Sequence, residues 1–329
     1  MVTASLHSEP RTRTKGGGRP AEAWMWGVIF ALFLFDVSLF VVQGNADAIL
    51  AFVVTKLLVA PFIALGLVCR YFKRDETIVT TMLMMTAFAL FTHVVTLANH
   101  AFLPLSRPLI DTTLAAWDAA LGFHWPSVLA FAAEYPTTTL VGRYIYNSSI
   151  VQAAVTLFVL GLGGWTLRME RFVLCSSLAA IVTISFWIVF PSFGPTTIYT
   201  VSSETVDIVA PVAGPEYGKH LLELAVKPNE GLARIETVGL IAFPSYHTVM
   251  AILVPLALWP VRWLRWPALL VNAAMMPFIV VHGGHYVIDL MGGAVVALAS
   301  WWFAGRLVHG WPRQSANNSL EVGSRPSAA

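Results

Sequence analysis

The stretch HYVIDLMGGAVVALASWWFAG, residues 285–305, joins a long apolar run to two ionisable side chains at its start. After Asp289 it has no further charged residue, and about 20 predominantly apolar residues suffice to cross a bilayer as a helix. His285 and Asp289 are four residues apart, so on a helix they would share one face. The stretch therefore predicts a membrane-spanning helix with a His–Asp pair at one end.

The composition of the whole chain also indicates a membrane protein. Of its 329 residues, 57% are hydrophobic and only 12% are charged, and the mean hydropathy is +0.70. Soluble domains have about 25% charged residues, so we interpret the chain as an integral membrane protein. Its two cysteines suggest no disulfide framework. The net charge of +2 does not indicate a nucleic-acid partner, and we expect none.

Eight apolar segments are long enough to be spans, which predicts an all-α fold of about eight transmembrane helices. A two-span hairpin within residues 24–77 would precede a six-span core within residues 78–305. No small-residue cleavage site follows the first apolar run, so we expect this run to be retained. Residues 1–23 and 306–329 are predicted to be disordered cytoplasmic tails. The predicted spans are 24–43, 49–70, 78–102, 145–167, 172–193, 245–264, 266–283 and 285–305.

The basic residues predict the orientation, because Lys and Arg favour the cytoplasmic side of a membrane. With the N-terminus inside, fourteen of the twenty basic residues are cytoplasmic and Lys56 lies within a span. Both termini are then cytoplasmic, and His285 lies at the outer surface, which we expect to be the extracytoplasmic face of a bacterial inner membrane. The five outer basic residues are Arg107, Arg143, Lys219, Lys227 and Arg234.

Two long outer segments remain, residues 103–144 and 194–241. The first contains an amphipathic pattern that predicts a helix lying on the membrane surface and ending at Gly122. Its apolar positions are Ile110, Leu114, Trp117 and Leu121, and Asp111 and Asp118 line another face. The second segment mixes Pro, Gly and charged residues, and a loop of that length is often functional.

The segment FPSYHT, residues 243–248, places a second histidine at the outer end of a predicted span. Ser245 suits a helix N-cap, and a helix N-terminus offers free N–H groups and a positive dipole end for phosphate. His247 and His285 would share one membrane depth. An Asp289 carboxylate would fix the imidazole tautomer and raise its basicity. These features suggest phosphoryl transfer, in which His285 attacks phosphorus and His247 protonates the leaving oxygen.

Two other interpretations of these histidines stay open. Interfacial histidines are often hydrogen-bonded packing residues. A four-ligand metal site is the sharper alternative, with His247, His282, His285 and Asp289 as ligands. Gly283 and Gly284 argue against it, because they loosen the helix that would align the two neighbouring histidines. We therefore predict a site with no metal and no cofactor.

FPSYH resembles the Pro-Ser-Gly-His motif of the type-2 phosphatidic acid phosphatase superfamily, and HYVIDLMGG resembles that family's His-x-x-x-Asp motif. The resemblance covers about residues 78–305 and implies a phosphatase-like six-helix core. It also implies His285 as the nucleophile, Asp289 as its partner and His247 as the acid.

The sequence departs from the superfamily pattern at three places. Tyr246 replaces the motif glycine, and Phe278-Ile279 stands where a Ser-Arg pair is expected. PSFGP, residues 191–195, replaces the Lys-x6-Arg-Pro motif. Two of the family's phosphate-binding cations are therefore missing.

These departures resemble one branch, the inositol phosphorylceramide synthases of the aureobasidin-resistance group, and more loosely the sphingomyelin synthases. The similar stretches are PSFGP, FPSYH, HYVIDLMGG, RPLID at 107–111, WDAALGFHW at 117–125, and Tyr146 with Ser148 and Gln152. The resemblance implies a sphingolipid-type phosphotransferase that moves a phospho-headgroup, such as an inositol phosphate, between lipids through a phosphohistidine. The candidate substrate-binding residues are Ser245, Tyr246, Arg107, Arg143 and Tyr146.

Two alternative functions stay open. In a lipid phosphate phosphatase the same chemistry would use water as the acceptor. A transporter is a remote alternative, suggested by Asp36 and Lys56 within the first two spans, where charges are costly and often functional. The two charges can also neutralise one another as a structural pair. The sequence does not indicate an oligomeric state.

Overall fold

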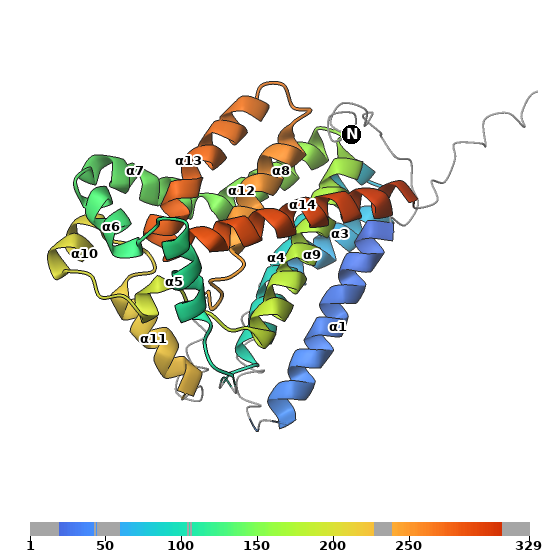
Figure 1. The fold of residues 1–329 in the computed structure, drawn as a ribbon. Coiled ribbons are helices and arrows are strands. Elements are labelled where there is room, and N and C mark those ends of the chain that lie inside the picture. Colours follow the sequence, from blue (N-terminus) through green and yellow to red (C-terminus); the bar gives the residue numbers. More distant parts are fainter. Residues whose placement is uncertain are drawn as a thin grey trace, which may run out of the picture.

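The computed structural model describes residues 20–42, 44, 60–103, 105, 107–226 and 239–310, and every secondary-structure element in this part of the chain is a helix (Figure 1). The predicted tails 1–23 and 306–329 lie outside the described residues, except that α1 begins at Pro20 and α14 extends to Gly310. The helices are α1 (Pro20–Val42), α3 (Ala60–Tyr71), α4 (Glu76–His100), α5 (Asp111–Ala120), α6 (Trp125–Ala133), α7 (Pro136–Asn147), α8 (Ser149–Leu162), α9 (Thr166–Val189), η2 (Pro195–Thr197), α10 (Ser203–Val209), α11 (Pro215–Val226), α12 (Tyr246–Leu258), α13 (Arg265–Gly283) and α14 (Val287–Gly310).

Five of these helices, α1, α4, α9, α13 and α14, are long and apolar enough to cross a membrane. The chain is thus an all-α integral membrane protein. The pair α7 and α8 passes the same test as one bent element, and α3 and α12 are shorter apolar helices. The predicted number of eight spans is therefore reached only if the bent pair and both short helices also cross.

The span predicted at 145–167 is interrupted, because α7 and α8 meet at an angle of 47°. Ser148 lies at the junction, and its hydroxyl donates to the carbonyl of Ile145 at 2.6 Å. Hydroxyl side chains that bond to a preceding carbonyl commonly bend helices. The predicted span runs through this bend, although the polar residues Asn147, Ser148 and Ser149 interrupt the apolar run there.

Helices α3 and α12 are both shorter than the spans predicted at 49–70 and 245–264. Only the end of the predicted span 49–70 is described, because residues 45–59 lie outside the described part of the chain. Helix α12 has 13 residues, which at 1.5 Å each give about 20 Å against a hydrocarbon core of about 30 Å. It begins at the Ser245 cap and ends at Leu258, so the predicted span 245–264 is shorter than expected.

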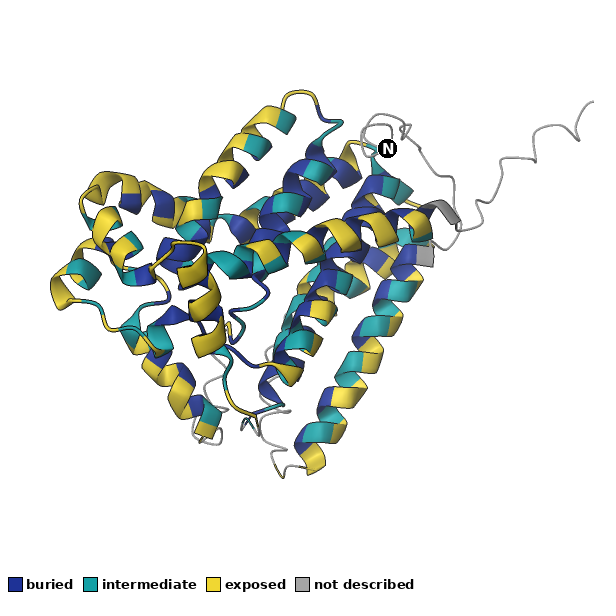
Figure 2. Ribbon diagram, in the orientation of Figure 1, coloured by how far each residue is buried: buried dark blue, intermediate teal, exposed yellow. Residues whose placement is uncertain are grey.

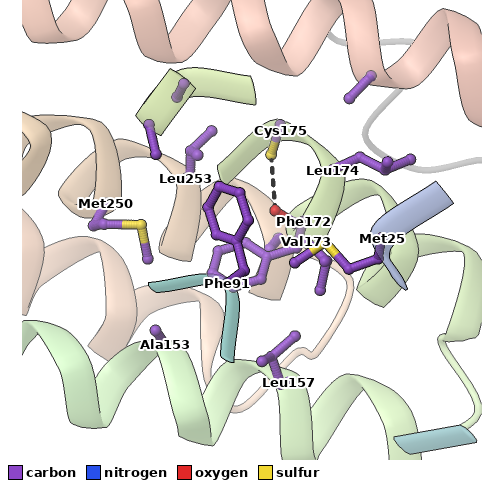
Figure 3. Close-up of a cluster of buried hydrophobic side chains, with 14 of the residues drawn as sticks. Met25, Phe91, Ala153, Leu157, Phe172, Val173, Leu174, Cys175, Met250 and Leu253 are labelled. Carbon is purple, nitrogen blue, oxygen red and sulfur yellow. Dashed lines mark hydrogen bonds between the residues drawn. The ribbon is translucent and has the colours of Figure 1, made fainter. Parts of the chain in front are cut away.

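The core of the bundle lies where α4, α8, α9, α12 and α14 meet. Figure 3 shows Phe91, Leu157, Phe172 and Leu253 packed together there, with the Cys175 thiol 3.2 Å from the Phe172 carbonyl. In Figure 2 the central helices carry most of the buried residues, whereas α1 exposes much of its surface. An apolar exposed surface is what a helix facing lipid requires.

Charged residues join the helices at one end of the bundle. Arg70 at the end of α3 pairs with Glu22 of α1 at 2.7 Å and with Glu76 of α4 at 2.9 Å. Arg171 in α9 donates to the carbonyl of Trp301 in α14 at 2.9 Å and lies 3.9 Å from the centre of that indole ring.

Asp36 is buried in α1, and its carboxylate oxygens make no hydrogen bond within the described residues. Its predicted partner, Lys56, lies outside those residues.

The short helices α5, α6, α7, α10 and α11 gather on the side of the bundle away from α1 (Figure 1). They belong to the predicted outer segments 103–144 and 194–241, of which residues 227–238 are not described. Two hydrogen bonds join this region to the end of α13. The Trp125 indole of α6 donates to the Val280 carbonyl at 3.1 Å, and the amide of Ala213, between α10 and α11, donates to the His282 carbonyl at 2.8 Å. The predicted end of the surface helix is confirmed, since α5 stops just before Gly122, whose φ is +84°.

Candidate active site

The FPSYHT segment forms the start of α12. The Ser245 hydroxyl accepts a hydrogen bond from the Thr248 amide at 3.4 Å, so the predicted N-cap is present. Ser245 is fully buried, and its backbone amide donates to the carbonyl of Asp289 at 3.1 Å. His247 lies in the first turn of α12, where backbone N–H groups have no intrahelical partner. The start of α12 is thus fixed against the start of α14.

His285 lies between two helices and not within one. Helix α13 ends at Gly283, Gly284 adopts a left-handed conformation with φ of +59°, and α14 begins at Val287. The predicted His–Asp contact is nevertheless present, with His285 Nδ1 3.1 Å from Asp289 Oδ2. The Asp289 carboxylate also accepts the Tyr286 amide at 2.9 Å.

This contact sets the protonation of the imidazole. A carboxylate accepts hydrogen bonds, so the Nδ1 atom of His285 carries the proton and the lone pair lies on Nε2. Burial lowers the pKa of His285 to about 4, and the nearby Ala242 carbonyl acts in the opposite direction. The ring is therefore neutral near pH 7, with Nε2 available as a nucleophile.

The second histidine lies next to the first. The ring centres of His247 and His285 are 6.3 Å apart, and the Ser245 hydroxyl lies 3.5 Å from His285 Nε2. Tyr146 stacks on His247 with ring centres 4.5 Å apart at an angle of 26°. Three segments that are distant in the sequence therefore meet at one place, with the two imidazoles close enough to act on one substrate.

Glycines allow these segments to approach. A Cβ atom on Gly293 would lie 2.4 Å from the Ser245 carbonyl, and one on Gly292 would lie 2.7 Å from the Phe243 ring. A Cβ atom on Gly194, in PSFGP, would lie 2.2 Å from the Gly284 carbonyl. Real Cβ atoms do not come within 3.0 Å of such neighbours. The glycines of HYVIDLMGG and PSFGP thus permit contact between the two histidine-bearing segments and the loop beside them.

Helix α5 contributes two residues that the sequence pattern did not single out as part of the site. Asp111 accepts the amides of Phe193 and Gly194 at 3.1 and 2.7 Å. Asp118 accepts the amides of Val287 and Ile288, both at 2.8 Å. Burial and the nearby Asp289 raise the pKa of Asp111 to about 7, and the two amide bonds oppose the shift. The signal available in the sequence was their spacing of seven residues, which puts both on one helix face.

The predicted substrate-binding residues occupy different places around this cluster. Tyr146 stacks on the His247 ring, and the Ser245 hydroxyl lies beside Nε2 of His285. The Tyr246 hydroxyl is directed away, donating to the Ser176 carbonyl of α9 at 3.0 Å. Arg143 is exposed on α7, and Arg107 is exposed with its guanidinium donating to the Val189 carbonyl at 3.2 Å.

The geometry does not assemble the four-ligand metal alternative. His282 Nε2 lies 2.8 Å from the Thr139 carbonyl, so its ring faces α7 instead of His285. Within the described residues, no three His, Cys, Asp or Glu side chains are grouped closely enough to hold a metal ion.

A comparison with protein-family models matches residues 112–303, more than half of the chain, to the PAP2 superfamily. The chain belongs to this superfamily. It is therefore an enzyme of the phosphatase and phosphotransferase type, embedded in a membrane and acting on lipid phosphates. No curated protein and no solved structure matches the chain.

Proposed function

We propose that this superfamily member transfers a phospho-headgroup between lipids, as inositol phosphorylceramide synthases do, through a phosphohistidine on His285. The observation that carries the chemistry is the His285–Asp289 contact of 3.1 Å beside the start of α12 and within 6.3 Å of the His247 ring. A neutral imidazole with an oriented lone pair, next to a helix N-terminus, suits attack on a phosphate group.

In the first half-reaction, the Nε2 lone pair of His285 attacks the phosphorus atom of the donor lipid. The bond from phosphorus to the leaving oxygen breaks. His247, which becomes protonated when the anionic phosphate binds beside it, gives that proton to the leaving oxygen. The result is a phosphohistidine and a neutral leaving alcohol. Asp289 stabilises the positive charge that develops on the His285 ring, because its carboxylate accepts the Nδ1 proton.

In the second half-reaction, the oxygen of the acceptor hydroxyl attacks the phosphorus, and His247 accepts the proton of that hydroxyl. The bond between phosphorus and Nε2 breaks, which restores neutral His285 and protonated His247. A lipid alcohol as the acceptor gives headgroup transfer, and water gives phosphate release. The phosphatase is the second candidate function, since the same residues support both outcomes.

Support for the transferase comes from the positions of the motifs that resemble inositol phosphorylceramide synthases. PSFGP contacts the residue before His285 through Gly194, FPSYH supplies Ser245 and His247, and HYVIDLMGG supplies the nucleophile. RPLID and WDAAL supply Asp111 and Asp118, which bond to two of these segments. The motifs that resemble inositol phosphorylceramide synthases are thus neighbours around one histidine.

The phosphate also needs a cation, since two cations of the superfamily pattern are missing. Of the two predicted arginines, we propose that Arg143 has the larger part, because it lies on α7 three residues before Tyr146 and its charge acts on the nearby His282. Arg107 already donates to the end of α9. Arg143→Ala is expected to raise KM more than Arg107→Ala. Equal effects of the two variants would contradict this ranking.

We further propose that the site faces the extracytoplasmic side of a bacterial inner membrane, from the distribution of basic residues. Ser203 is exposed on α10, which packs against α6 and α7. A cysteine at this position, with Cys69 and Cys175 replaced, is expected to react with an impermeant thiol reagent in intact cells. Labelling only after lysis would place the site on the cytoplasmic side.

The deciding experiment uses purified protein and a panel of donor lipids, with and without ceramide or diacylglycerol as acceptor. Headgroup transfer to the acceptor exceeding phosphate release supports the transferase. Phosphate release that is independent of the acceptor supports the phosphatase. Neither product with any donor would overturn the proposed function, and the transporter would then be tested by substrate uptake into vesicles.

A further inference from the structure

Helix α5 lies against the candidate site with its charged face turned inward. Asp111 and Asp118 are 1% and 4% exposed, whereas Trp117 on the other side is 50% exposed. A spacing of seven residues is close to two helical turns, so both carboxylates point to the same side. A surface helix in water would show the reverse arrangement, with carboxylates outward and aromatic rings inward. Two buried carboxylates therefore need partners inside the protein.

The partners of Asp118 are at the start of α14. Its two oxygens accept the amides of Val287 and Ile288, each at 2.8 Å. The first amides of a helix have no intrahelical partner, and a carboxylate near them is stabilised by the helix dipole. Asp118 thus acts as an N-cap supplied by a helix about 170 residues earlier in the chain. It fixes the turn that carries Asp289, the partner of His285.

The partners of Asp111 are in PSFGP. Its oxygens accept the amides of Phe193 and Gly194. Gly194 in turn lies against the carbonyl of Gly284, so closely that a Cβ atom would be 2.2 Å from it. Gly284 directly precedes His285. The nucleophile is therefore supported before it by Asp111 through the PSFGP loop, and after it by Asp118 through the start of α14.

We propose that Asp111 and Asp118 are positioning residues, which together hold His285 and Asp289 in the geometry for attack on phosphorus. This inference rests on the proposed function of the same site. Neither aspartate touches the reacting atoms, because each acts through backbone amides of a neighbouring segment. Their loss should lower kcat and leave KM nearly unchanged, since the substrate-binding residues are elsewhere. A displacement of about 1 Å can cost about 100-fold in rate.

The test compares Asp118→Ala and Asp118→Asn with wild type in the lipid-phosphate assay. Asp118→Ala removes both acceptors and is expected to lower kcat about 100-fold. Asp118→Asn keeps one carbonyl oxygen that can accept one amide, so its kcat should lie between the kcat of wild type and that of Asp118→Ala. Asp111→Ala is expected to act in the same direction. An Asp118→Ala enzyme with the kcat of wild type would overturn the inference.

Two control variants separate positioning from folding. Thr113→Ala changes an exposed residue of α5 and should keep wild-type kcat and thermal stability. Leu157→Ala removes a buried side chain from the core of the bundle, so it should lower the unfolding temperature but not the kcat of the folded enzyme. If Leu157→Ala lowered kcat as much as Asp118→Ala at equal loss of stability, the effect would be structural and the inference would be wrong.

Hydrogen exchange provides a readout that does not depend on activity. In wild type the amides of Val287 and Ile288 should be protected, and in Asp118→Ala they should exchange faster while the rest of α14 stays unchanged. Unchanged exchange at these amides would overturn the inference even if the enzyme is active. Protected amides in a wild-type protein with no activity toward any lipid phosphate would instead overturn the proposed function, and with it the catalytic part of the inference.

Discussion

The two ends of α14 are held in different ways. At its start, carboxylates from α5 and from α14 itself accept backbone amides, and Gly293 lets the helix touch the carbonyl of Ser245. Toward its other end, Arg171 of α9 donates to the Trp301 carbonyl and lies over the indole ring, with Gly305 leaving room for the guanidinium.

The difference lies in what each set of contacts fixes. Directional bonds to consecutive amides determine the position of a turn within tenths of an ångström, which the chemistry of His285 requires. Packing of a cation on an aromatic ring contributes to stability but tolerates small shifts. We therefore expect changes at the start of α14 to affect catalysis, and changes near its end to affect stability.

The largest effect is expected from a pair of substitutions at the two ends. His285→Ala should reduce turnover by on the order of 10⁶-fold, as removal of a covalent nucleophile does in other enzymes, while the unfolding temperature stays near that of wild type. Arg171→Met should keep kcat but lower stability by about 2–3 kcal/mol, because a charged hydrogen bond and a cation–π contact are lost. Steady-state kinetics and thermal unfolding in detergent measure both quantities. Measurable turnover by His285→Ala, with no acid-labile phosphoenzyme in wild type, would exclude the covalent mechanism.

A smaller effect is expected from His247, which would move a proton without forming a bond to phosphorus. His247→Ala should slow cleavage of an alkyl phosphate about 10²–10⁴-fold. A nitrophenyl ester has a leaving group that needs little protonation, so its cleavage should be slowed much less. The comparison of the two substrates is the measurement. Equal losses on both would assign His247 to binding or structure instead of proton transfer.

The glycines of α14 give a direct test of the contrast between its ends. In Gly293→Ala the new methyl would meet the Ser245 backbone, which cannot move without displacing the start of α12, so kcat should fall about 100-fold. In Gly305→Ala the methyl meets the guanidinium of Arg171, so stability should fall by about 1–3 kcal/mol with kcat preserved. Gly27→Ala in α1, which has open space around it, is the matched control. A loss of kcat in Gly305→Ala as large as that in Gly293→Ala would remove the distinction between the two ends.

The smallest expected effect is a pH dependence of stability at Asp111, which holds the PSFGP loop beside the residue before His285. The pKa of Asp111 is about 7 in the folded protein, against 3.8 for an ordinary aspartate. Between these values the folded state binds more protons than the unfolded state, so this group's contribution to stability is lost as pH rises from about 4 to 7. Asp111→Asn does not titrate, so the unfolding temperature of the variant minus that of wild type should increase over this range. His285 contributes to stability in the opposite direction, but it does so in both proteins, so its contribution cancels in the difference of unfolding temperatures. A difference that stays constant over this pH range would show that Asp111 is ionised throughout.

The sequence determined the class of the protein and the identity of its histidines. Composition and apolar length predict a helical membrane protein without any knowledge of packing, because lipid accepts only segments whose backbone is bonded internally. The Ser245 cap and the end of α5 before Gly122 also follow from the sequence, since both depend on local backbone preferences.

Only the tertiary structure decided how the candidate site is held. The sequence places Asp111 and Asp118 on one helix face, but it does not tell whether that face meets water or protein. Their partners, the amides of PSFGP and of the start of α14, are about 80 and 170 residues away. Contacts between residues so far apart in the sequence depend on how whole helices pack. Every residue except proline has a backbone amide, so the sequence does not mark which amides will lie beside a carboxylate.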